Sequence, residues 1–453
     1  MTWSPTLFAS ERFAVMGLGR NGLPVAHALR AMGADVSVWD DKAEARTGCG
    51  LPLHDPADGL HGFTALVLSP GIPHHLPAPH PSAAAARAAG IPVLSDAELL
   101  FQAVRRSGSA ARFVGVTGTN GKSTTTALLA HVFATAGIDA VAGGNLGTPA
   151  LALPLLADCG VYVLEMSSYM LERLTTLRFD AAALLNLSPD HLDRHDGMEG
   201  YIAAKRHVFD RMDASSTAVL GIDDAETAAL AGGLHGPRIL TVSGHCPADV
   251  WCDAGVLRDA DGPILAMQQA PALPGAHNAQ NAAAAAAVAL SLGVARQAVA
   301  AGISSFAGLP HRQQLVAEID GVAWVNDSKA TNADAASRAL GCYDRLIWIV
   351  GGMAKAGGIE ALRPDFPRVA HALLIGRDAP VLARTLAAAG VPHSTPGTLD
   401  AAVPAARALA SRLHSPVVLL SPACASFDQF TGFEARGDRF RDLVLSPGLR
   451  RTA

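Results

Sequence analysis

The sequence predicts an α/β protein of three domains, each built on a largely parallel sheet. Short apolar runs with strand character alternate with helical stretches along the whole chain. The 453 residues also exceed what one ordinary hydrophobic core organises, and half of them are apolar while 17% are charged, as in globular proteins. We place the domain boundaries near Ser107 and Gly308, which gives domains over residues 1–107, 108–308 and 309–453.

Composition excludes several classes of protein. A net charge of -5 and a pI near 6.4 argue against a nucleic-acid binder, which needs a basic face. The six cysteines lack C-x-x-C spacing and indicate neither a zinc site nor a disulfide framework. The N-terminus lacks the pattern of a signal peptide, and no apolar run reaches the roughly 20 residues of a membrane span. We expect a cytoplasmic protein with no membrane insertion.

The first domain opens with a Rossmann-like βαβ unit. A strand over residues 12–16 leads into the turn Gly17-x-Gly19-x-x-Gly22, a helix, and a strand over residues 35–39 that ends at Asp40. The pattern by itself suggests a dinucleotide site with Asp40 on a ribose. The glycines would equally serve to pack the helix on the strand, and that alternative stays open. A further strand, residues 65–68, runs into a turn at Gly71, where ligands bind in open α/β sheets.

A phosphate-binding loop opens the second domain. A strand over residues 112–116 and a helix over residues 124–136 flank the segment Gly118-Thr119-Asn120-Gly121-Lys122-Ser123-Thr124. Backbone N–H groups at a helix N-terminus point at phosphate oxygens, Lys122 would pair with the β and γ phosphates, and Ser123 would bind magnesium. The strict P-loop spacing requires a glycine at Val116, and Gly115 lies one residue too early. We therefore predict a P-loop ATPase-like domain with a variant loop.

Three more residues of this domain are candidates for metal binding. Glu165 ends a buried strand over residues 161–164, opposite the loop, where a carboxylate can hold magnesium. His191 follows a strand expected over residues 181–187 and is either a second ligand or an ordinary exposed histidine. Lys205 lies on a helix and is either a surface lysine or, in an enclosed site, an amine that reacts with carbon dioxide.

The third domain carries polar clusters beside the ends of its predicted strands. Arg312, the segment 326–332 and the segment 421–428 each lie at or near such an end. Lys329 and Arg312 are fixed cations suited to a γ-phosphate or a developing acyl phosphate. Asn278 opens an alanine-rich helix at the end of the second domain. Its amide either recognises a base or phosphate or caps the helix.

Several of these motifs together resemble the Mur ligases over essentially the whole chain. The resemblance rests on residues 117–123, 143–147, 165–168, 190–194, 205, 275–281, 311–312 and 326–332. The P-loop is also shared with folylpolyglutamate synthetases. Segments 326–332 and 420–430 are similar to the branch of the family that adds D-glutamate to UDP-N-acetylmuramoyl-L-alanine. In that branch the P-loop's ATP phosphorylates the substrate carboxylate, and the amine of D-glutamate attacks the acyl phosphate.

The resemblance implies a role for each candidate residue. The catalytic residues would be Lys122, His191, Lys205 and Lys329. ATP would be bound by Gly118, Thr119, Asn120, Gly121, Lys122, Ser123, Thr124, Asn278, Arg312 and Asp327. The UDP-substrate would be bound by Arg20, Asn21, Asp40, Asp41, Gly71 and Asn145. D-Glutamate would be bound by His191, Lys329, Thr331, Lys355, Ser426 and Phe433. Two magnesium ions would be held by Ser123, Glu165, His191 and Lys205, the last as a carbamate.

Other functions remain to be distinguished by experiment. A related ligase could add a different amino acid or polyglutamylate folate, although the sequence around Thr331 and Ser426 disfavours both. A nucleotide-regulated binding protein would need no ligase turnover, and a dehydrogenase would use the first domain for a nicotinamide cofactor. For the ligase we expect a monomer whose third domain closes on the second during catalysis.

Overall fold

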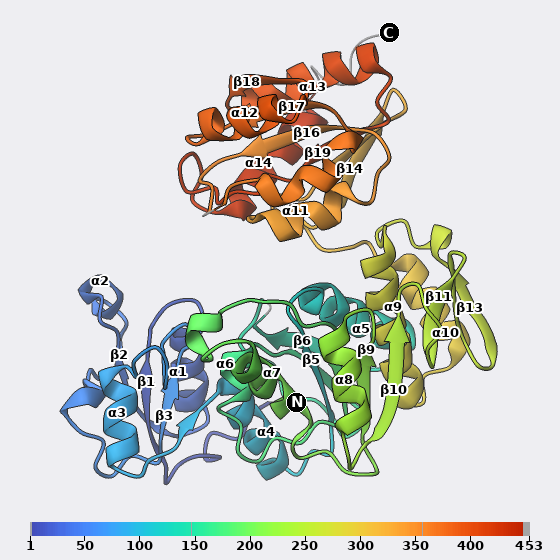
Figure 1. Ribbon diagram of the computed structural model, residues 1–453. Helices are drawn as coiled ribbons and strands as arrows, with labels where there is room; N and C mark the ends of the chain where they lie inside the picture. The colour runs from blue at the N-terminus through green and yellow to red at the C-terminus, as the bar shows by residue number, and fades with distance from the viewer. Residues whose placement is uncertain (1, 146, 356, 447–453) are drawn as a thin grey trace. The chain divides into compact units, whose positions relative to one another are not determined.

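A computed structural model describes residues 2–145, 147–355 and 357–446. Parts of two predictions lie outside the described residues. They are Met1 and residues 447–453 of the predicted end domains, and Leu146 of the 143–147 motif. Three sheets follow one another along the chain, and helices cover them (Figure 1). None of the helices in the described ranges has the length and apolar character needed to cross a membrane.

The first sheet contains four parallel strands in the order β2-β1-β3-β4. These are β1 (Arg12–Met16), β2 (Asp35–Trp39), β3 (Ala65–Leu68) and β4 (Val93–Leu94). Helix α1 (Gly22–Ala31) packs on one face and α3 (Pro81–Ala88) on the other, each with its own core (Figure 1). Because the strands are parallel, the turns that follow β1, β2 and β3 meet at one edge of the sheet.

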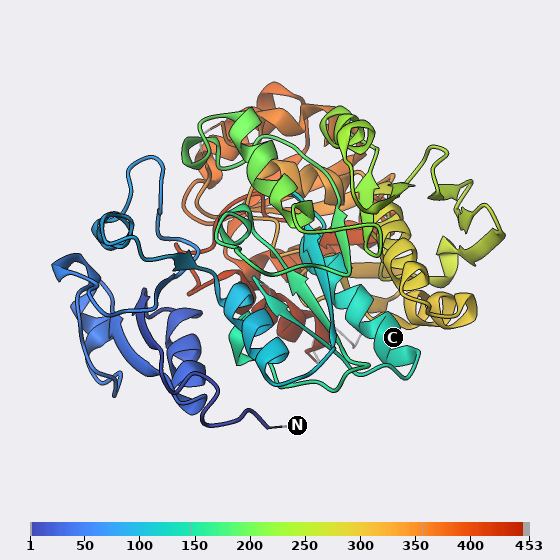
Figure 2. The ribbon, with the colours of Figure 1, turned by 90° about the horizontal axis from the view of Figure 1, so that it is seen from below.

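The second sheet contains nine strands in the order β13-β12-β11-β10-β9-β8-β5-β7-β6. A parallel core is formed by β5 (Arg112–Thr117), β6 (Ala140–Gly144), β7 (Val161–Glu165), β8 (Ala181–Leu184), β9 (Thr217–Gly221) and β10 (Arg238–Ser243), and β11 joins β10 in the same direction. The meander β11 (Val250–Asp253), β12 (Val256–Asp259) and β13 (Gly262–Ala266) adds antiparallel pairs that the sequence did not predict. Helix α10 (Arg296–Ser305) packs along α5 (Lys122–Thr135) (Figure 2).

The third sheet contains six strands in the order β14-β15-β19-β16-β17-β18. They are β14 (Gln314–Ile319), β15 (Val322–Asn326), β16 (Leu346–Gly351), β17 (Val369–Ile375), β18 (His393–Gly397) and β19 (Val417–Leu420). Only β14 is antiparallel to its neighbour. Separate cores on the two faces pack against α11 (Ala333–Leu340) and α12 (Ala379–Ala388) on one side and α13 (Leu399–Leu413) and α14 (Phe433–Leu445) on the other.

The remaining helices connect the strands of the first two sheets. They are α2 (Ala43–Arg46), α4 (Asp96–Arg106), α6 (Ser168–Leu171), α7 (Met198–Arg206), α8 (Ala225–Gly233) and α9 (Ala276–Ser291). By contact, the chain divides into two compact units rather than three. One holds the first two sheets (Met1–Gln269 and Asn278–Phe306), and the other holds the third sheet (Ala270–His277 and Ala307–Ala453). The three-domain boundaries remain a prediction.

One predicted strand is too long. The apolar run Ala181–Leu187 suggested a single strand, but β8 ends at Leu184. Beyond it the chain turns onto the phosphate-binding loop, where Asn186 accepts a 2.9 Å hydrogen bond from the backbone N–H of Asn120 and donates a 3.1 Å bond to its carbonyl. The polar amide therefore ends the strand and supports the loop.

Candidate active site

The loop between β5 and α5 needs glycine at two positions. Gly118 has φ +145° and Gly121 has φ +84°, both in the region that side chains rarely adopt. A Cβ on Gly121 would lie 2.3 Å from Oδ1 of Asn281, so a side chain has no room there. Gly115 has a different role, because it lies within β5 and a Cβ there would be 2.9 Å from the ring of Phe179. The glycine that looked out of register is thus a packing residue of the strand.

Lys122 begins α5 and folds back over the loop. Its ammonium donates to the carbonyls of Gly118, at 2.8 Å, and Thr119, at 2.7 Å. Ser123 is buried in the first helical turn beside it. Tyr201 of α7 reaches the loop from the other side, with its hydroxyl 3.1 Å from that of Thr119. Thr119, Lys122 and Ser123 therefore lie together at the N-terminus of α5, where the sequence predicts a phosphate site.

Glu165, the last residue of β7, is buried and has one oxygen without a partner. Its Oε1 accepts a 2.7 Å hydrogen bond from the side-chain amide of Asn145. Its Oε2 is buried and accepts no hydrogen bond from any residue in the described ranges. A buried carboxylate oxygen without a donor is costly unless a cation compensates it. The residue therefore fits a magnesium ligand.

Lys205 is buried, which excludes the interpretation of a surface lysine. Its amine donates to the carbonyl of Gly118 at 2.8 Å and lies 3.4 Å from the hydroxyl of Thr117. Burial, and then the neighbouring charge of Lys122, lowers the pKa of the Lys205 amine well below its usual value. No acidic partner within salt-bridge distance is found for it among the described residues. Its surroundings therefore favour the neutral amine more than water does.

His191 lies in the turn after β8 and is half exposed. Its φ of +51° is left-handed, and its Nε2 lies 3.6 Å from Asp190. Partial burial lowers the pKa of the His191 imidazole, which favours the neutral form that metal ions bind. The residue borders a cavity of about 240 Å³, which it shares with two other predicted catalytic residues, Lys122 and Lys205. The lining comprises Pro70, Gly71, Lys122, Asn145, Ser167, Ser168, Tyr169, Asp190, His191, Tyr201 and Lys205.

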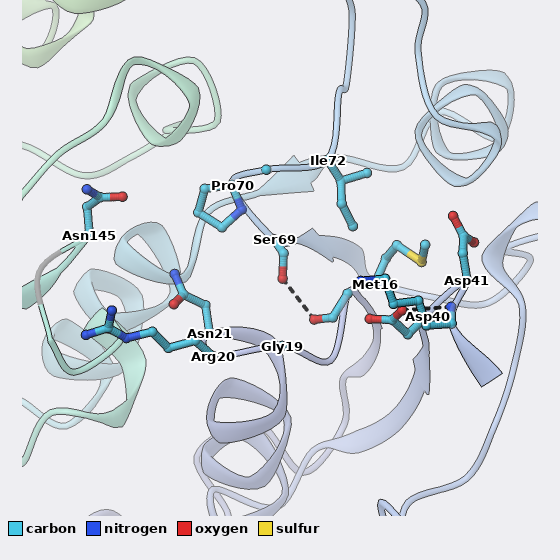
Figure 3. A pocket seen from close by; sticks show the side chains of 13 residues that line it. Met16, Gly19, Arg20, Asn21, Asp40, Asp41, Ser69, Pro70, Ile72 and Asn145 are labelled. Atoms are coloured by element: carbon cyan, nitrogen blue, oxygen red, sulfur yellow. Dashed lines mark hydrogen bonds between the residues drawn. The ribbon is translucent and has the colours of Figure 1, made fainter. Parts of the chain in front are cut away.

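A second cavity, of about 520 Å³, lies at the edge of the first sheet (Figure 3). All six residues predicted to bind the UDP-substrate line it, and Arg20 and Asn21 extend toward Asn145 while Asp40 and Asp41 lie farther from it (Figure 3). The full lining is Met16, Gly17, Gly19, Arg20, Asn21, Asp40, Asp41, Lys42, Ser69, Pro70, Gly71, Ile72 and Asn145. We call it the nucleotide-side cavity and the smaller one the phosphate-side cavity.

Two carboxylates of the nucleotide-side cavity already have partners. Asp40 accepts hydrogen bonds from the backbone N–H groups of Leu18, at 2.7 Å, and Lys42, at 2.9 Å. Asp41 lies 2.9 Å from the imidazole of His80. Asp40 therefore closes the glycine-rich turn onto the end of β2. Asp40 therefore has a structural role in the turn, in addition to the ribose contact that the sequence pattern suggests.

The two cavities share three lining residues, Pro70, Gly71 and Asn145. Pro70 and Gly71 belong to the turn after β3, and Asn145 follows β6. A ligand whose nucleotide occupies the first cavity can therefore extend into the second, toward Lys122 and Lys205. This continuity joins the glycine-rich turn of the first sheet to the phosphate loop of the second.

A buried arginine that the sequence did not single out shapes the shared turn. Arg173, just after α6, donates to the carbonyls of Leu68 and Ile72 at 2.7 Å each and of Ser69 at 3.3 Å. Burial lowers the pKa of its guanidinium to about 10, which leaves it charged at neutral pH. Three backbone carbonyls of the first sheet's turn are thus held by a side chain from the second sheet.

The neighbouring Glu172 is linked through His195 to two residues that line the phosphate-side cavity, Ser168 and Tyr169. Its carboxylate lies 3.2 Å from Nδ1 of His195, and Nε2 of His195 lies 2.9 Å from the hydroxyl of Ser168. His195 also stacks on Tyr169, at 5.4 Å between ring centroids. No separate role for His195 could be predicted from the sequence, because its partners are brought together only by the fold.

Within the second unit, Asp327 is buried beside the end of β19. Its carboxylate accepts a 2.8 Å hydrogen bond from the hydroxyl of Ser421 and a 3.2 Å hydrogen bond from the backbone N–H of Gln313. Burial outweighs these bonds and the charge of Arg312, and it raises the pKa of Asp327 to about 7. The side chain therefore exchanges a proton near neutral pH, which the sequence alone did not indicate.

Lys329 and Phe433 are brought together in the same unit. The ammonium of Lys329 lies 3.8 Å from the centroid of the Phe433 ring, a cation–π contact. Arg436, buried in α14, donates to Ser328 and to the carbonyl of Cys424, and so ties the segment of Lys329 to the segment of Ser426. Sequence reasoning missed Arg436, since a helical arginine gives no signal of burial.

The other residues predicted for the third domain differ in exposure. Ser426 is buried and lies next to Ala425, which pairs with Met353. Lys355 is exposed and Thr331 is half-buried. Asn278 belongs to the first unit, where its side chain accepts a 3.1 Å bond from Asn281. The residues predicted to bind ATP are thus divided between the two units.

Comparison with known proteins places the chain in a family. Residues 116–289 match the model of the Mur ligase middle domain. The UDP-N-acetylmuramoylalanine--D-glutamate ligase of Paramagnetospirillum magneticum is 50% identical, with 97% of this chain and 98% of the relative covered. The enzyme of the same name from Rhodospirillum rubrum is 46% identical, with 98% and 97% covered.

Solved structures support the fold. The chain is similar to the UDP-N-acetylmuramate-alanine ligase MurC of Thermotoga maritima, with a TM-score of 0.60 and 17% identity over 95% of this chain and 98% of that one. It is also similar to MurF of Acinetobacter baumannii, with a TM-score of 0.58 and 20% identity over 76% and 80%. Since the identity to the first relatives extends over nearly the whole chain, the protein belongs to the UDP-N-acetylmuramoylalanine--D-glutamate ligases of the Mur ligase family.

Proposed function

We propose that the chain uses ATP to join D-glutamate to UDP-N-acetylmuramoyl-L-alanine in the synthesis of peptidoglycan precursors. The observation that carries the proposal is the continuity of the two cavities through Pro70, Gly71 and Asn145. A substrate with a nucleotide at one end and a carboxylate at the other matches this arrangement. The membership of the family supports the identity of that substrate.

The reaction proceeds in two displacements. An oxygen of the alanyl carboxylate attacks the γ-phosphorus of ATP, and the bond to ADP breaks, which forms an acyl phosphate. The amine of D-glutamate then attacks the carbonyl carbon, and phosphate leaves as the amide forms and a proton is lost. Phosphorylation is necessary because a carboxylate is a poor electrophile. Lys122 lies at the N-terminus of α5, where its charge and the helix dipole stabilise the transferring phosphoryl group.

Ser123 and Glu165 are the residues that we assign to one magnesium ion, and His191 and Lys205 to a second. Bound magnesium would neutralise charge on the phosphates. The partnerless Oε2 of Glu165 supports the first assignment. Magnesium prefers oxygen ligands, which Ser123 and Glu165 offer and an amine does not. The second assignment therefore requires a chemical modification of Lys205 that supplies oxygen beside the imidazole of His191.

Carbamylation supplies that modification. The neutral Lys205 amine attacks the carbon of carbon dioxide, one carbon–oxygen π bond shifts to oxygen, and the nitrogen loses a proton. The product is an anionic carbamate that offers oxygen ligands. Burial favours the neutral amine, and the nearby positive charge of Lys122 stabilises the anion once it forms. The hydrogen bond from Nζ to the carbonyl of Gly118 uses an N–H that the carbamate retains.

The second unit is assigned to the amino acid and part of the nucleotide. We place D-glutamate against Lys329, Thr331, Lys355, Ser426 and Phe433. The contact between Lys329 and Phe433 supports this, because it fixes an ammonium that can pair with a carboxylate. Arg312 and Asp327 are assigned to ATP together with Asn278 of the first unit.

The test is phosphate release with defined substrates. The protein is incubated with magnesium-ATP, UDP-N-acetylmuramoyl-L-alanine and one of D-glutamate, L-glutamate, L-lysine or L-alanine. Release that requires both the nucleotide substrate and D-glutamate is expected, and Lys122→Ala should abolish it. Release with another amino acid in place of D-glutamate would overturn the assignment. Binding of ATP without any turnover would favour the nucleotide-regulated binding protein instead.

A further inference from the structure

Three potential metal ligands lie outside both cavities, where two neighbouring strands of the second sheet end. Asp223 follows β9, and His245 and Cys246 follow β10. Because β9 and β10 are parallel and adjacent, their following turns meet at the same edge. One carboxylate oxygen, one imidazole nitrogen and one thiol sulfur all lie within 4.8 Å of one another. The fold thus brings together three kinds of donor atom from separate turns.

The separations are close to those of ligands around a tetrahedral ion. Nδ1 of His245 lies 3.6 Å from Oδ2 of Asp223, and Sγ of Cys246 lies 3.9 Å from Oδ1. Zinc bonds of about 2.1 Å to nitrogen or oxygen and about 2.3 Å to sulfur separate such ligands by about 3.4 and about 3.6 Å at the tetrahedral angle. The nitrogen and the sulfur lie nearest to different oxygens of Asp223, so an ion held by all three residues requires side-chain rotation that brings one of these oxygens within reach of both.

The turn that carries the ligands is already ordered. The N–H of Gly244 donates to Oδ2 of Asp223 at 2.9 Å. The hydroxyl of Ser243 accepts from the N–H groups of His245, at 3.1 Å, and Cys246, at 2.9 Å, and itself donates to Asp223. Each carboxylate oxygen has two acceptor sites, so Asp223 keeps capacity for an ion. Binding would therefore cost little ordering of the backbone.

We propose that Asp223, His245 and Cys246 form a binding site for zinc or a similar divalent transition metal, with water in the fourth position. A thiolate and an imidazole select such metals over magnesium, which prefers oxygen. His245 is 62% exposed and Asp223 only 18%, so an ion can enter from solvent and reach a partly enclosed carboxylate. Binding converts the Cys246 thiol to a thiolate and releases its proton. This site lies apart from the proposed magnesium ligands.

The expected effect of the ion is to stiffen this edge of the sheet. The side chain of Asp224, the next residue, accepts two backbone hydrogen bonds. One comes from the N–H of Thr227 in the first turn of α8, at 2.8 Å, and the other from the N–H of Leu187, at 3.3 Å. Leu187 leads into the segment of His191. An ion that fixes Asp223 would therefore also restrain the turn beside the phosphate-side cavity.

This site could not be predicted from the sequence, because its ligands lack the spacing of a zinc motif. Asp223 lies far ahead of the other two ligands, and His245 and Cys246 are adjacent. The earlier expectation that the cysteines indicate no zinc site therefore rested on spacing alone.

Cobalt titration of the metal-free protein tests the proposal, with excess magnesium present to occupy oxygen-ligand sites. One equivalent of Co²⁺ should produce the near-ultraviolet charge-transfer band of a cobalt–thiolate bond, and zinc should abolish it. Cys246→Ser should eliminate the band, and His245→Gln should weaken cobalt binding about tenfold or more. Cys159→Ser, which removes an exposed cysteine elsewhere, should leave the band unchanged.

Three results would overturn the site: no thiolate band in the unaltered protein, a band that persists in Cys246→Ser, or saturation only at millimolar cobalt. Both Cys246→Ser and His245→Gln alter partly or fully exposed side chains, so circular dichroism should show them folded. The readout is independent of ligase turnover. If the protein lacks ligase activity, the cobalt spectrum is still expected. If the cobalt band is absent, the proposed ligase activity is unaffected.

Discussion

The side-chain amide of Asn145 donates a 2.7 Å hydrogen bond to Oε1 of Glu165 and leaves Oε2 of that carboxylate without a partner in the described structure. Asn145 also lines both cavities. One residue thus contacts the space proposed for the acceptor and orients the carboxylate proposed for magnesium. Binding of the acceptor and binding of the metal should therefore be linked through Asn145.

Asn145→Ala should raise the magnesium concentration needed for half-maximal activity and the KM for the nucleotide acceptor together. Loss of a residue that orients a metal ligand typically costs about 10–100-fold in metal affinity or activity. Initial rates over a grid of magnesium and acceptor concentrations measure both effects. The KM for D-glutamate serves as the internal control and should change little. An unchanged magnesium requirement would contradict the link.

Lys205→Ala should lose ligase activity and regain part of it with formate or acetate. The small carboxylate would replace the missing carbamate oxygens in the space left by the side chain. Rates are measured in the absence and presence of each acid, with Lys122→Ala as the matched control that no acid should rescue. If acids do not rescue Lys205→Ala and removal of bicarbonate leaves the unaltered enzyme fully active, the carbamate is excluded.

Arg173→Met should raise the KM for the nucleotide acceptor by about tenfold or more, while the KM for ATP changes less. The substitution leaves three carbonyls of the turn after β3 without their donor, at about 1–3 kcal/mol for each buried group left unpaired. Arg105→Met is the matched control, because Arg105 also donates to two backbone carbonyls but lines neither cavity. Equal effects of both variants on the acceptor KM would mean a general loss of stability.

Asp327→Asn should remove a pH dependence of unfolding. The pKa of Asp327 is raised from 3.8 to about 7 in the folded state, so the folded protein binds more protons than the unfolded chain between these values. Its contribution to stability is therefore present at low pH and declines as pH rises from about 4 to about 7. Denaturant unfolding at several pH values should show a smaller decline for the variant. Identical profiles would contradict the raised pKa.

Much of the fold was predictable because buried parallel strands leave a strong sequence pattern. The strands β1, β2 and β3 have the bounds expected from the sequence. The meander β11 to β13 was not predicted, since its strands have only four or five residues each and carry no long apolar run. Strand β8 was overestimated because Leu185 and Leu187 extend the apolar pattern past the turn.

The candidate site was predictable where chemistry lies in short motifs. Lys122 of the phosphate loop and Gly71 of the turn after β3 line the same cavity, and Glu165, at the end of β7, is hydrogen-bonded to Asn145 of that lining. Arg173, His195 and Arg436 could not be predicted in this way. Their partners are backbone carbonyls or side chains distant in sequence, and only the folded chain shows that they are buried.

The lining of the two cavities has a consequence for covalent chemistry. The chain has only five lysines, against 30 arginines. Lys42, Lys122 and Lys205 line a cavity, and Lys329 and Lys355 belong to the proposed amino-acid site. An acylating metabolite that reacts with lysine would therefore find no inert target on this protein. Each acylation event would fall on a residue beside a substrate, so the extent of acylation should report directly on lost turnover.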